Sequence, residues 1–132
     1  MRFRICILSS IFLIPALLLS CNEKKYPTAP PSPGRVTLYN DSGITIIIEK
    51  YIQQRGDQEV SRIVNGHLFQ GGSYKFTNII DGNNSLVFDG GDKVNVLYKS
   101  QGSDSPFSGS WTVEVNGNIS GKLNRSGGVG GQ

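Results

Sequence analysis

The sequence has little of the chemistry that usually marks an enzyme or a disulfide-stabilised domain. Its two cysteines are Cys6 and Cys21, and Cys6 lies in an apolar N-terminal stretch. We therefore expect no structural disulfide and no thiolate metal cluster. The chain has a single histidine, His67, and histidine is the residue that general-base catalysis and metal binding use most often. The chain also has no G-x-S-x-G motif, which would mark a serine nucleophile. We predict no catalytic residues and no cofactor, and a hydrolase is the least favoured function.

The sequence also lacks an apolar run long enough for a permanent transmembrane helix, which needs roughly 20 mostly apolar residues. The run at 5–19 is interrupted by two serines and Pro15, and it follows Arg2 and Arg4. A basic flank before a short apolar stretch is typical of a secretory signal peptide, which we place at 1–20. Loss of this segment removes both arginines from a formal net charge of +3. No basic stripe is left, so we do not expect nucleic-acid binding.

The apolar stretch ends in Leu18-Leu19-Ser20-Cys21. This motif resembles the lipobox of bacterial lipoproteins, in which an aliphatic, a variable and a small residue precede an invariant cysteine. The resemblance implies that the Cys21 thiol is joined to diacylglycerol and that the chain is cut before it. It also implies that the new amino terminus is acylated, for example with palmitate. Thiolate is the side-chain nucleophile best suited to forming a thioether.

Two or more acyl chains hold a protein stably on a membrane, whereas one chain binds marginally. We therefore expect Cys21 to be the lipidation site and the membrane to be a partner. The expected location is the bacterial cell envelope. Asn22, rather than aspartate, follows the cysteine. This residue indicates the outer membrane if the host is Gram-negative.

Two segments are expected to stay outside the folded core. Residues 21–34 hold four of the six prolines, and proline fixes φ and removes a backbone donor. We predict an extended, semi-rigid spacer there, which lifts the domain off the bilayer. Residues 126–132, "SGGVGGQ", have almost nothing to bury and are predicted to be a disordered tail. One domain of modest core is predicted between them, at 35–125.

The segment 35–125 shows no sustained 3.6-residue apolar period. Alternating runs rich in Val, Ile, Thr, Tyr and Phe are separated by Gly, Asn and Asp, which predicts an all-β domain. Mostly short loops favour antiparallel neighbours, because a parallel connection needs a dozen or more residues. We predict a small antiparallel β-sandwich, Ig-like or related, of about seven to nine strands, with an open β-barrel as the alternative. The strands are expected at 35–39, 44–53, 58–64, 67–69, 73–79, 85–88, 93–100, 110–115 and 119–123.

Turn chemistry and alternation refine this prediction. Asn65-Gly66 and Asn116-Gly117 suit two-residue turns with positive φ at both positions. Along 44–53, strict alternation places the isoleucines 44, 46, 48 and 52 on one face and Tyr51 and Gln53 on the other. The rest of the predicted core is Val36, Leu38, Tyr74, Phe76, Val94, Val96, Tyr98, Trp111, Val113 and Val115.

Two acidic turns contain oxygen ligands that calcium accepts. These calcium candidates are Asp81, Asn83, Asp89 and Asp92. The EF-hand spacing is absent, and Asp and Asn beside Gly are ordinary turn formers. We therefore predict no metal, and the four residues remain weak candidates.

The stretch 101–109 is expected to be the longest irregular segment, and long loops on sandwich scaffolds often carry binding. Within or beside it we note Phe107, expected as an exposed apolar anchor, and Trp111, expected to pack in the core. Both are candidate binding residues. The phrases "SDSPFSGSW" and "YNDSGITIIIEKY" together are similar to aegerolysin-type lipid-binding β-sandwiches. The chain lacks the cysteine-containing segment of that family, so lipid recognition is assigned to no residue.

These features predict a membrane-anchored, non-catalytic lipoprotein that serves as a binding or envelope-associated structural module. A surface module that binds lipid or glycan is the alternative.

Overall fold

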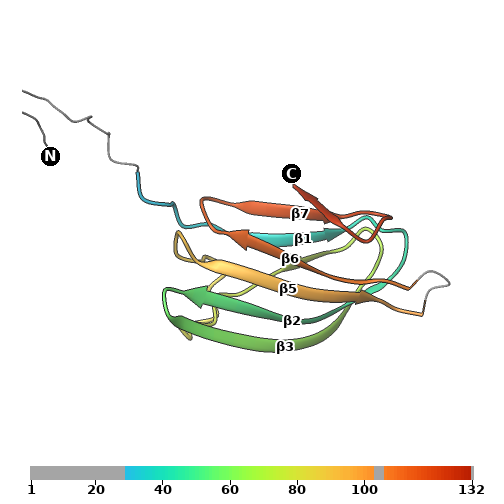
Figure 1. Ribbon diagram of the computed structural model, residues 1–132, viewed down its shortest axis with the longest axis horizontal. Coiled ribbons are helices and arrows are strands. Elements are labelled where there is room, and N and C mark those ends of the chain that lie inside the picture. The colour runs from blue at the N-terminus through green and yellow to red at the C-terminus, as the bar shows by residue number, and fades with distance from the viewer. Residues whose placement is uncertain (1–28, 103–105, 132) are drawn as a thin grey trace, which may run out of the picture.

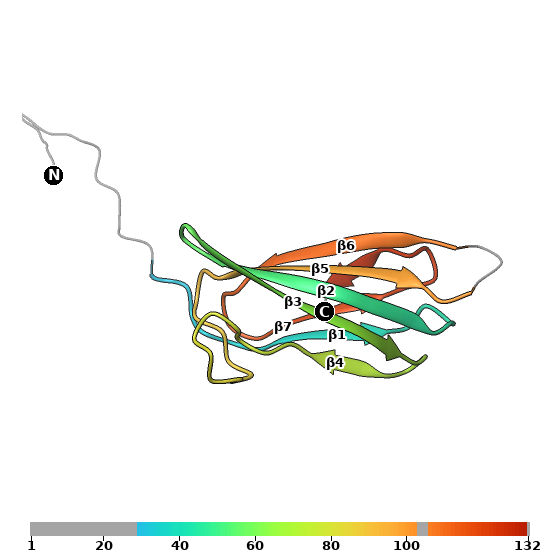
Figure 2. The ribbon, with the colours of Figure 1, turned by 90° about the horizontal axis from the view of Figure 1, so that it is seen from below.

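Two stacked sheets make up the domain in a computed structural model that describes residues 29–102 and 106–131 (Figures 1 and 2). The first sheet has the order β4-β1-β7-β8 and the second β3-β2-β5-β6. The strands of the first sheet are β1 (Val36–Asn40), β4 (Ser73–Lys75), β7 (Ile119–Leu123) and β8 (Val129–Gly131). The strands of the second are β2 (Ile46–Arg55), β3 (Gln58–Leu68), β5 (Lys93–Ser100) and β6 (Ser108–Glu114).

The predicted β-sandwich is confirmed. The barrel alternative is wrong, because the strands form two separate open sheets. The predicted signal peptide, Cys21 and the first part of the predicted linker, up to residue 28, lie outside the described residues.

The strand pairing contains one arrangement that the sequence did not predict, a parallel pair. β1 lies parallel to β7, with Val36 opposite Ile119, whereas the other strand pairs are antiparallel. The chain passes through both sheets between β1 and β7, so the connection far exceeds the dozen residues that a parallel pair requires. The Asn116-Gly117 turn therefore carries the chain from β6 to the other sheet rather than closing a hairpin. Positive φ occurs there at Gly117 and not at Asn116.

The core lies between the two sheets, and along most strands it follows the predicted alternation. Val94, Val96 and Tyr98 of β5 are all buried. The other predicted core residues that are buried are Val36, Leu38, Ile46, Ile48, Phe76 and Val115. Tyr74, Trp111 and Val113 pack against this core from partly exposed positions.

The predicted alternation fails in the middle of β2, at a β-bulge. Ile48 is opposite Tyr98 of β5, and Lys50 is opposite the next residue, Leu97, so Glu49 is an extra residue on β2. Because side chains alternate with a period of two, one extra residue reverses the face of every side chain that follows. Tyr51 and Gln53 consequently point into the core and are fully buried, and the prediction that placed Ile52 inside is wrong.

The same β-bulge explains the backbone conformation at Asn65-Gly66. The predicted hairpin turn is wrong, because the two strands expected around it are one continuous strand, β3. Val64 and Asn65 together lie opposite Glu49 of β2, and Asn65 has a φ of 47°. Asn is one of the few residues besides Gly that adopts this conformation readily. The positive φ was thus correctly indicated, but it serves a bulge.

The predicted strands at 73–79 and 85–88 are mostly absent. β4 covers only Ser73–Lys75, and an isolated bridge joins Phe88 to Gly34. Residues 76–92 therefore form a long connection between β4 and β5. This connection is longer than the one between β5 and β6, so the expectation that 101–109 is the longest irregular stretch is wrong.

Both ends of the domain extend beyond the predicted limits of 35 and 125. β8 pairs with β7, and Val129 packs against the core, so the prediction of a disordered tail is wrong for 126–131. Gly127, with a φ of 88°, provides the reversal before β8. A glycine-rich composition suggested disorder, but here glycine allows the positive φ that the turn requires.

The last residues of the predicted linker are part of the fold. The Gly34 amide donates to the Phe88 carbonyl at 3.2 Å, and the Phe88 amide donates back at 2.8 Å. The Gly117 amide donates to the Ser32 carbonyl at 2.8 Å. The Pro31 carbonyl lies against Gly90 so closely that a Cβ at that glycine would overlap it. Residues 31–34 are therefore fixed to the sandwich.

Candidate functional site

The sandwich has two ends, and the chain enters the domain at one of them (Figures 1 and 2). At one end, residues 29–34 enter beside the Gly56-Asp57 hairpin turn, the connection 76–92 and the Asn116-Gly117 turn. We call this the entry end. The opposite end carries the connections 41–45, 69–72 and 124–128, together with residues 101–102 and 106–107 beside β5 and β6. We call it the loop end.

Three of the calcium candidates meet at the entry end, around the guanidinium of Arg55. Nε of Arg55 donates to Asp92 Oδ1 at 2.8 Å, and Nη1 donates to Asp81 Oδ1 at 2.8 Å. Asp89 Oδ2 lies 3.4 Å from the same Nη1. The guanidinium thus occupies the space between the carboxylates, and a calcium ion there would have to displace it. Asn83 lies apart from this group and accepts a hydrogen bond from the Ser85 amide.

These ion pairs change the proton affinities of the groups involved. Hydrogen bonds to Asp92, and then to Asp81, raise the pKa of Arg55, because both favour the charged guanidinium. The hydrogen bond from Arg55, followed by one from Asn78, lowers the pKa of Asp81. In the part of the chain that the structure describes, no group of three or more His, Cys, Asp and Glu side chains is arranged to hold a metal ion.

The buried side of this cluster holds the long connection in place. Gln53 Nε2 donates to Asp92 Oδ2 at 2.8 Å and to Asn78 Oδ1 at 3.0 Å, and Gln53 Oε1 accepts from the Ile79 amide at 2.7 Å. Asn78 in turn donates to the Val87 carbonyl at 3.1 Å. Buried polar groups are costly unless paired, and here each has partners. The entry end is consequently a rigid structural region.

The loop end is held together by Asn40, a buried residue that the sequence analysis did not single out. Its Nδ2 donates to the carbonyls of Ile44 and Leu68, both at 2.8 Å. Its Oδ1 accepts from the Ser42 amide at 3.0 Å and from the Ser42 hydroxyl at 2.6 Å. Asn40 thereby fixes the connection 41–45 against the end of β3.

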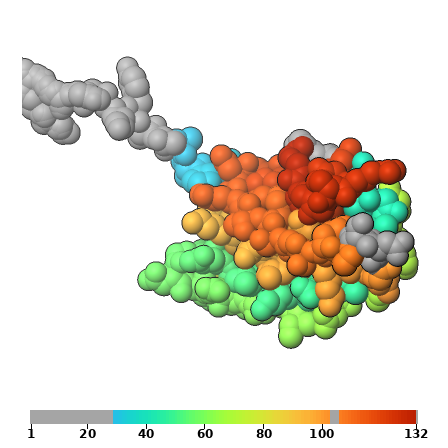
Figure 3. Space-filling view, turned by 45° about the vertical axis from the view of Figure 1, so that its right-hand side comes forward, coloured from blue at the N-terminus to red at the C-terminus, as the bar shows by residue number. Residues whose placement is uncertain are grey.

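An open, shallow depression lies on the loop end. Its lining residues are Asp41, Gln70, Asn124, Arg125 and Ser126. Gln70 Nε2 donates to Asp41 Oδ1 at 3.3 Å, and the Arg125 side chain lies over Gly43. Figure 3 shows residues near 40–45 beside the C-terminal hairpin at this end.

The depression combines groups that can recognise a polar ligand. Arg125 forms no ion pair within the described ranges, so its charge is available. Phe69, next to Gln70 in the chain, is 68% exposed. Sequence reasoning missed this site because its residues lie in three separate connections, 41–45, 69–72 and 124–128, and only the fold brings them together.

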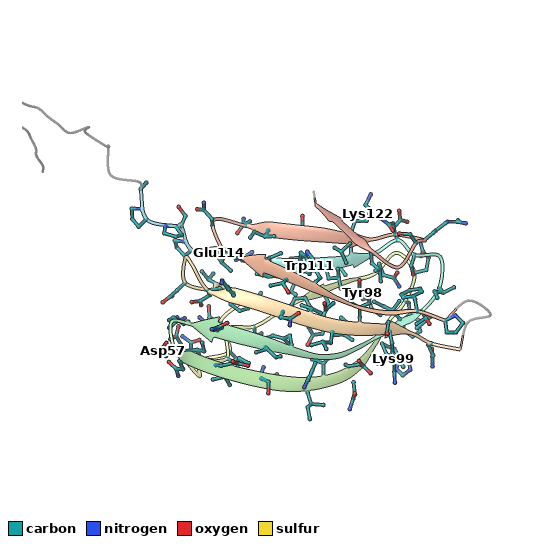
Figure 4. The ribbon with its side chains drawn as sticks, in the orientation of Figure 1. Asp57, Tyr98, Lys99, Trp111, Glu114 and Lys122 are labelled. Atoms are coloured by element: carbon teal, nitrogen blue, oxygen red, sulfur yellow. The ribbon has the colours of Figure 1, made fainter. Side chains whose placement is uncertain are left out.

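Phe107 and Trp111, the predicted binding candidates, lie between the sheets on the side of β6 and β8. The expectation that Phe107 is an exposed anchor is wrong. It packs over Gly127 and edge-on to Tyr98, with ring centroids 6.5 Å apart. Trp111 packs over Gly121 and against the core, as expected (Figure 4).

His67 lies exposed on β3. Its Nε2 is 2.9 Å from Nε2 of Gln101. Within the described ranges it forms no ion pair or hydrogen bond with a carboxylate. A histidine that acts as a general base is usually oriented by such a partner.

No protein-family model matches this sequence, and no curated protein matches it significantly. The described residues form strands and loops without a helix, so none of them forms a helix able to span a bilayer.

The Arg55 cluster leads to a stability prediction. Arg55→Met leaves the Asp92 carboxylate, which is 1% exposed, without its cation, and should lower the free energy of unfolding by about 3 kcal/mol. Lys99→Met breaks the exposed pair with Glu49 and should cost less than about 1 kcal/mol. Urea denaturation of both variants measures the difference. Equal losses would contradict a structural role for the cluster.

Proposed function

We propose that this protein is a non-catalytic module, held on the bacterial envelope by acyl chains on Cys21, that presents its loop end to a ligand or partner. The observation that supports this most is the point where the chain enters the sandwich. Residues 31–34 are bonded to Phe88, Asn116 and Gly117 at the entry end. A linker that starts there leaves the opposite end accessible.

The linker suits this arrangement. About ten residues separate Cys21 from the fixed segment, and they would span roughly 30 Å as polyproline II. The formal charge left after loss of the signal peptide is small, so charge alone would hold the protein to a membrane only weakly. An acylated cysteine provides the stable attachment. In a host with two membranes, the outer membrane is the proposed site.

The loop end supports binding rather than catalysis. The depression offers a carboxylate, amides and a guanidinium on connections that the buried Asn40 holds in place. Such groups recognise polar ligands, whereas a nucleophile beside an oriented base is what hydrolysis requires. His67, without a carboxylate partner in the described part of the chain, supports the same choice.

A glycan-binding or lipid-binding module is the second candidate, and Phe69 favours it. An aromatic ring that is 68% exposed beside polar side chains can cover the apolar face of a sugar or enter a lipid headgroup layer. Phe69 replaces Phe107 in this role, because Phe107 packs inward.

The anchor is tested by labelling cells that express the full chain with radioactive palmitate. The wild-type protein and Cys6→Ala should carry label and sediment with membranes, because the thioether forms at residue 21. Cys21→Ala should carry none. Label in Cys21→Ala at the wild-type level would contradict the proposed site.

The loop end is tested by crosslinking the anchored protein in its native envelope. Phe69→Ala combined with Arg125→Ala should reduce recovery of the crosslinked ligand at least tenfold, because Arg125 lines the depression and Phe69 is exposed next to the lining residue Gln70 in the chain. Asp57→Ala combined with Lys93→Ala alters two exposed residues of the entry end and serves as the control. Equal recovery with both double variants would contradict the assignment.

A further inference from the structure

Among the residues that the structure describes, the outer face of the first sheet carries cations and no carboxylate. Val36 and Leu38 of β1 are buried in the core, so alternation places Thr37 and Tyr39 on the outer side of the sheet. Thr37 is covered there by its neighbours at 9% exposure, whereas Tyr39 is 39% exposed. The residues paired with these two are Lys75 and Ser73 on β4 and Ser120 and Lys122 on β7. Alternation places Arg35 on the same side. We call Arg35, Lys75 and Lys122, with Tyr39 among them, the basic face.

The cations of the basic face are available for an external partner. Arg35, Lys75 and Lys122 are all exposed. The ion pairs of the described residues involve Arg55 and Lys99 as cations and none of these three.

Carboxylates lie elsewhere in the described part of the chain. Asp81, Asp89 and Asp92 surround Arg55, and Asp41 lies at the loop end. The outer face of the second sheet has mixed charge, with Lys50, Lys93 and Lys99 together with Glu49, Glu59 and Glu114. Figure 4 shows Lys122 on one sheet and Lys99 and Glu114 on the other. One outer face is therefore positive and the other has mixed charge, although the net charge of the chain is small.

We propose that the basic face docks onto the anionic phospholipid headgroups of the membrane that carries the protein. The proposal rests on the proposed function, because it assumes attachment through Cys21. In this orientation the outer face of the second sheet points away from the bilayer, and the loop end stays accessible at the side.

The linker permits this orientation, and charge selects it. A linker of roughly 30 Å is long compared with the spacing of about 10 Å between stacked sheets, so the domain can stand upright or lie flat. Attachment gives the domain an effective concentration at the surface on the order of millimolar. Each lysine or arginine near an anionic surface strengthens binding roughly fivefold, so three are enough once the domain is tethered.

Tyr39 adds a contact of the right kind. Tyr39 is 39% exposed on the basic face, where it lies on β1 between Ser73 and Lys122 of the neighbouring strands. Tyrosine is enriched at membrane interfaces because it has an apolar ring and a polar tip.

The experiment uses the chain from Cys21 to Gln132, which contains both sheets and the fixed segment 31–34. Cys21 is coupled to a maleimide lipid in vesicles of phosphatidylcholine with or without phosphatidylglycerol. Lysine acetylation is then followed by mass spectrometry. On anionic vesicles, Lys75 and Lys122 should react at least about threefold more slowly than Lys50 and Lys93, which are exposed on the other sheet. The difference should vanish on neutral vesicles and in about 0.5 M salt.

A matched pair of variants tests the contribution of charge. Without coupling, Lys75→Glu combined with Lys122→Glu should bind anionic vesicles at least tenfold more weakly than the wild type. Lys50→Glu combined with Lys93→Glu makes the same change in net charge on the opposite face and should stay within about twofold. Circular dichroism verifies that both variants are folded.

Three results would overturn the proposal: equal protection of all four lysines on anionic vesicles, stronger protection of Lys50 and Lys93 there, or selective protection of Lys75 and Lys122 that persists on neutral vesicles. Chemical coupling replaces acylation in the cell, so the docking test does not depend on the palmitate result. Selective protection without palmitate labelling would refute the anchor alone, and labelling without selective protection would refute the docking alone.

Discussion

The β-bulge at Glu49 determines which side chains of β2 face the core, and the entry end of the sandwich depends on it. Beyond the bulge, Tyr51, Gln53 and Arg55 point toward the connection 76–92. The Tyr51 hydroxyl donates to the Thr77 carbonyl at 2.7 Å, Gln53 accepts from the Ile79 amide, and Arg55 pairs with Asp92. A strand with uninterrupted alternation would direct these three side chains to solvent.

The fixed connection in turn positions the start of the domain. Phe88 pairs with Gly34, and Gly90 lies beneath the Pro31 carbonyl. Polar contacts thus fix this segment where some small secreted domains use a disulfide, and they bury the Asp92 carboxylate. The cost of this burial is offset because Asp92 has a cation and a buried amide as partners. The proposed accessibility of the loop end follows from this segment, since it sets where a linker begins.

Sequence patterns predicted the architecture and much of the core because those features depend on short-range periodicity. β5 occupies the predicted residues 93–100, and its alternating valines are buried as expected. Strict alternation could not predict which side chains of β2 face the core after the bulge, although Asn65-Gly66 indicated the positive φ at the bulge. The acidic turns suggested calcium because their cation, Arg55, lies in a distant hairpin and meets them only in the fold. The loop-end depression likewise joins residues 41 and 125 through tertiary structure.

Amide hydrogen exchange in Gln53→Leu compared with the wild type tests most directly whether the inward-facing residues of β2 hold the entry segment. The substitution removes the bonds to Asn78, Asp92 and the Ile79 amide while filling a similar volume. The account predicts that the amides of Gly34 and Phe88 exchange at least tenfold faster in the variant, while those in the centre of β5 keep their wild-type rates. Wild-type exchange at Gly34 and Phe88 in a folded Gln53→Leu protein would contradict it.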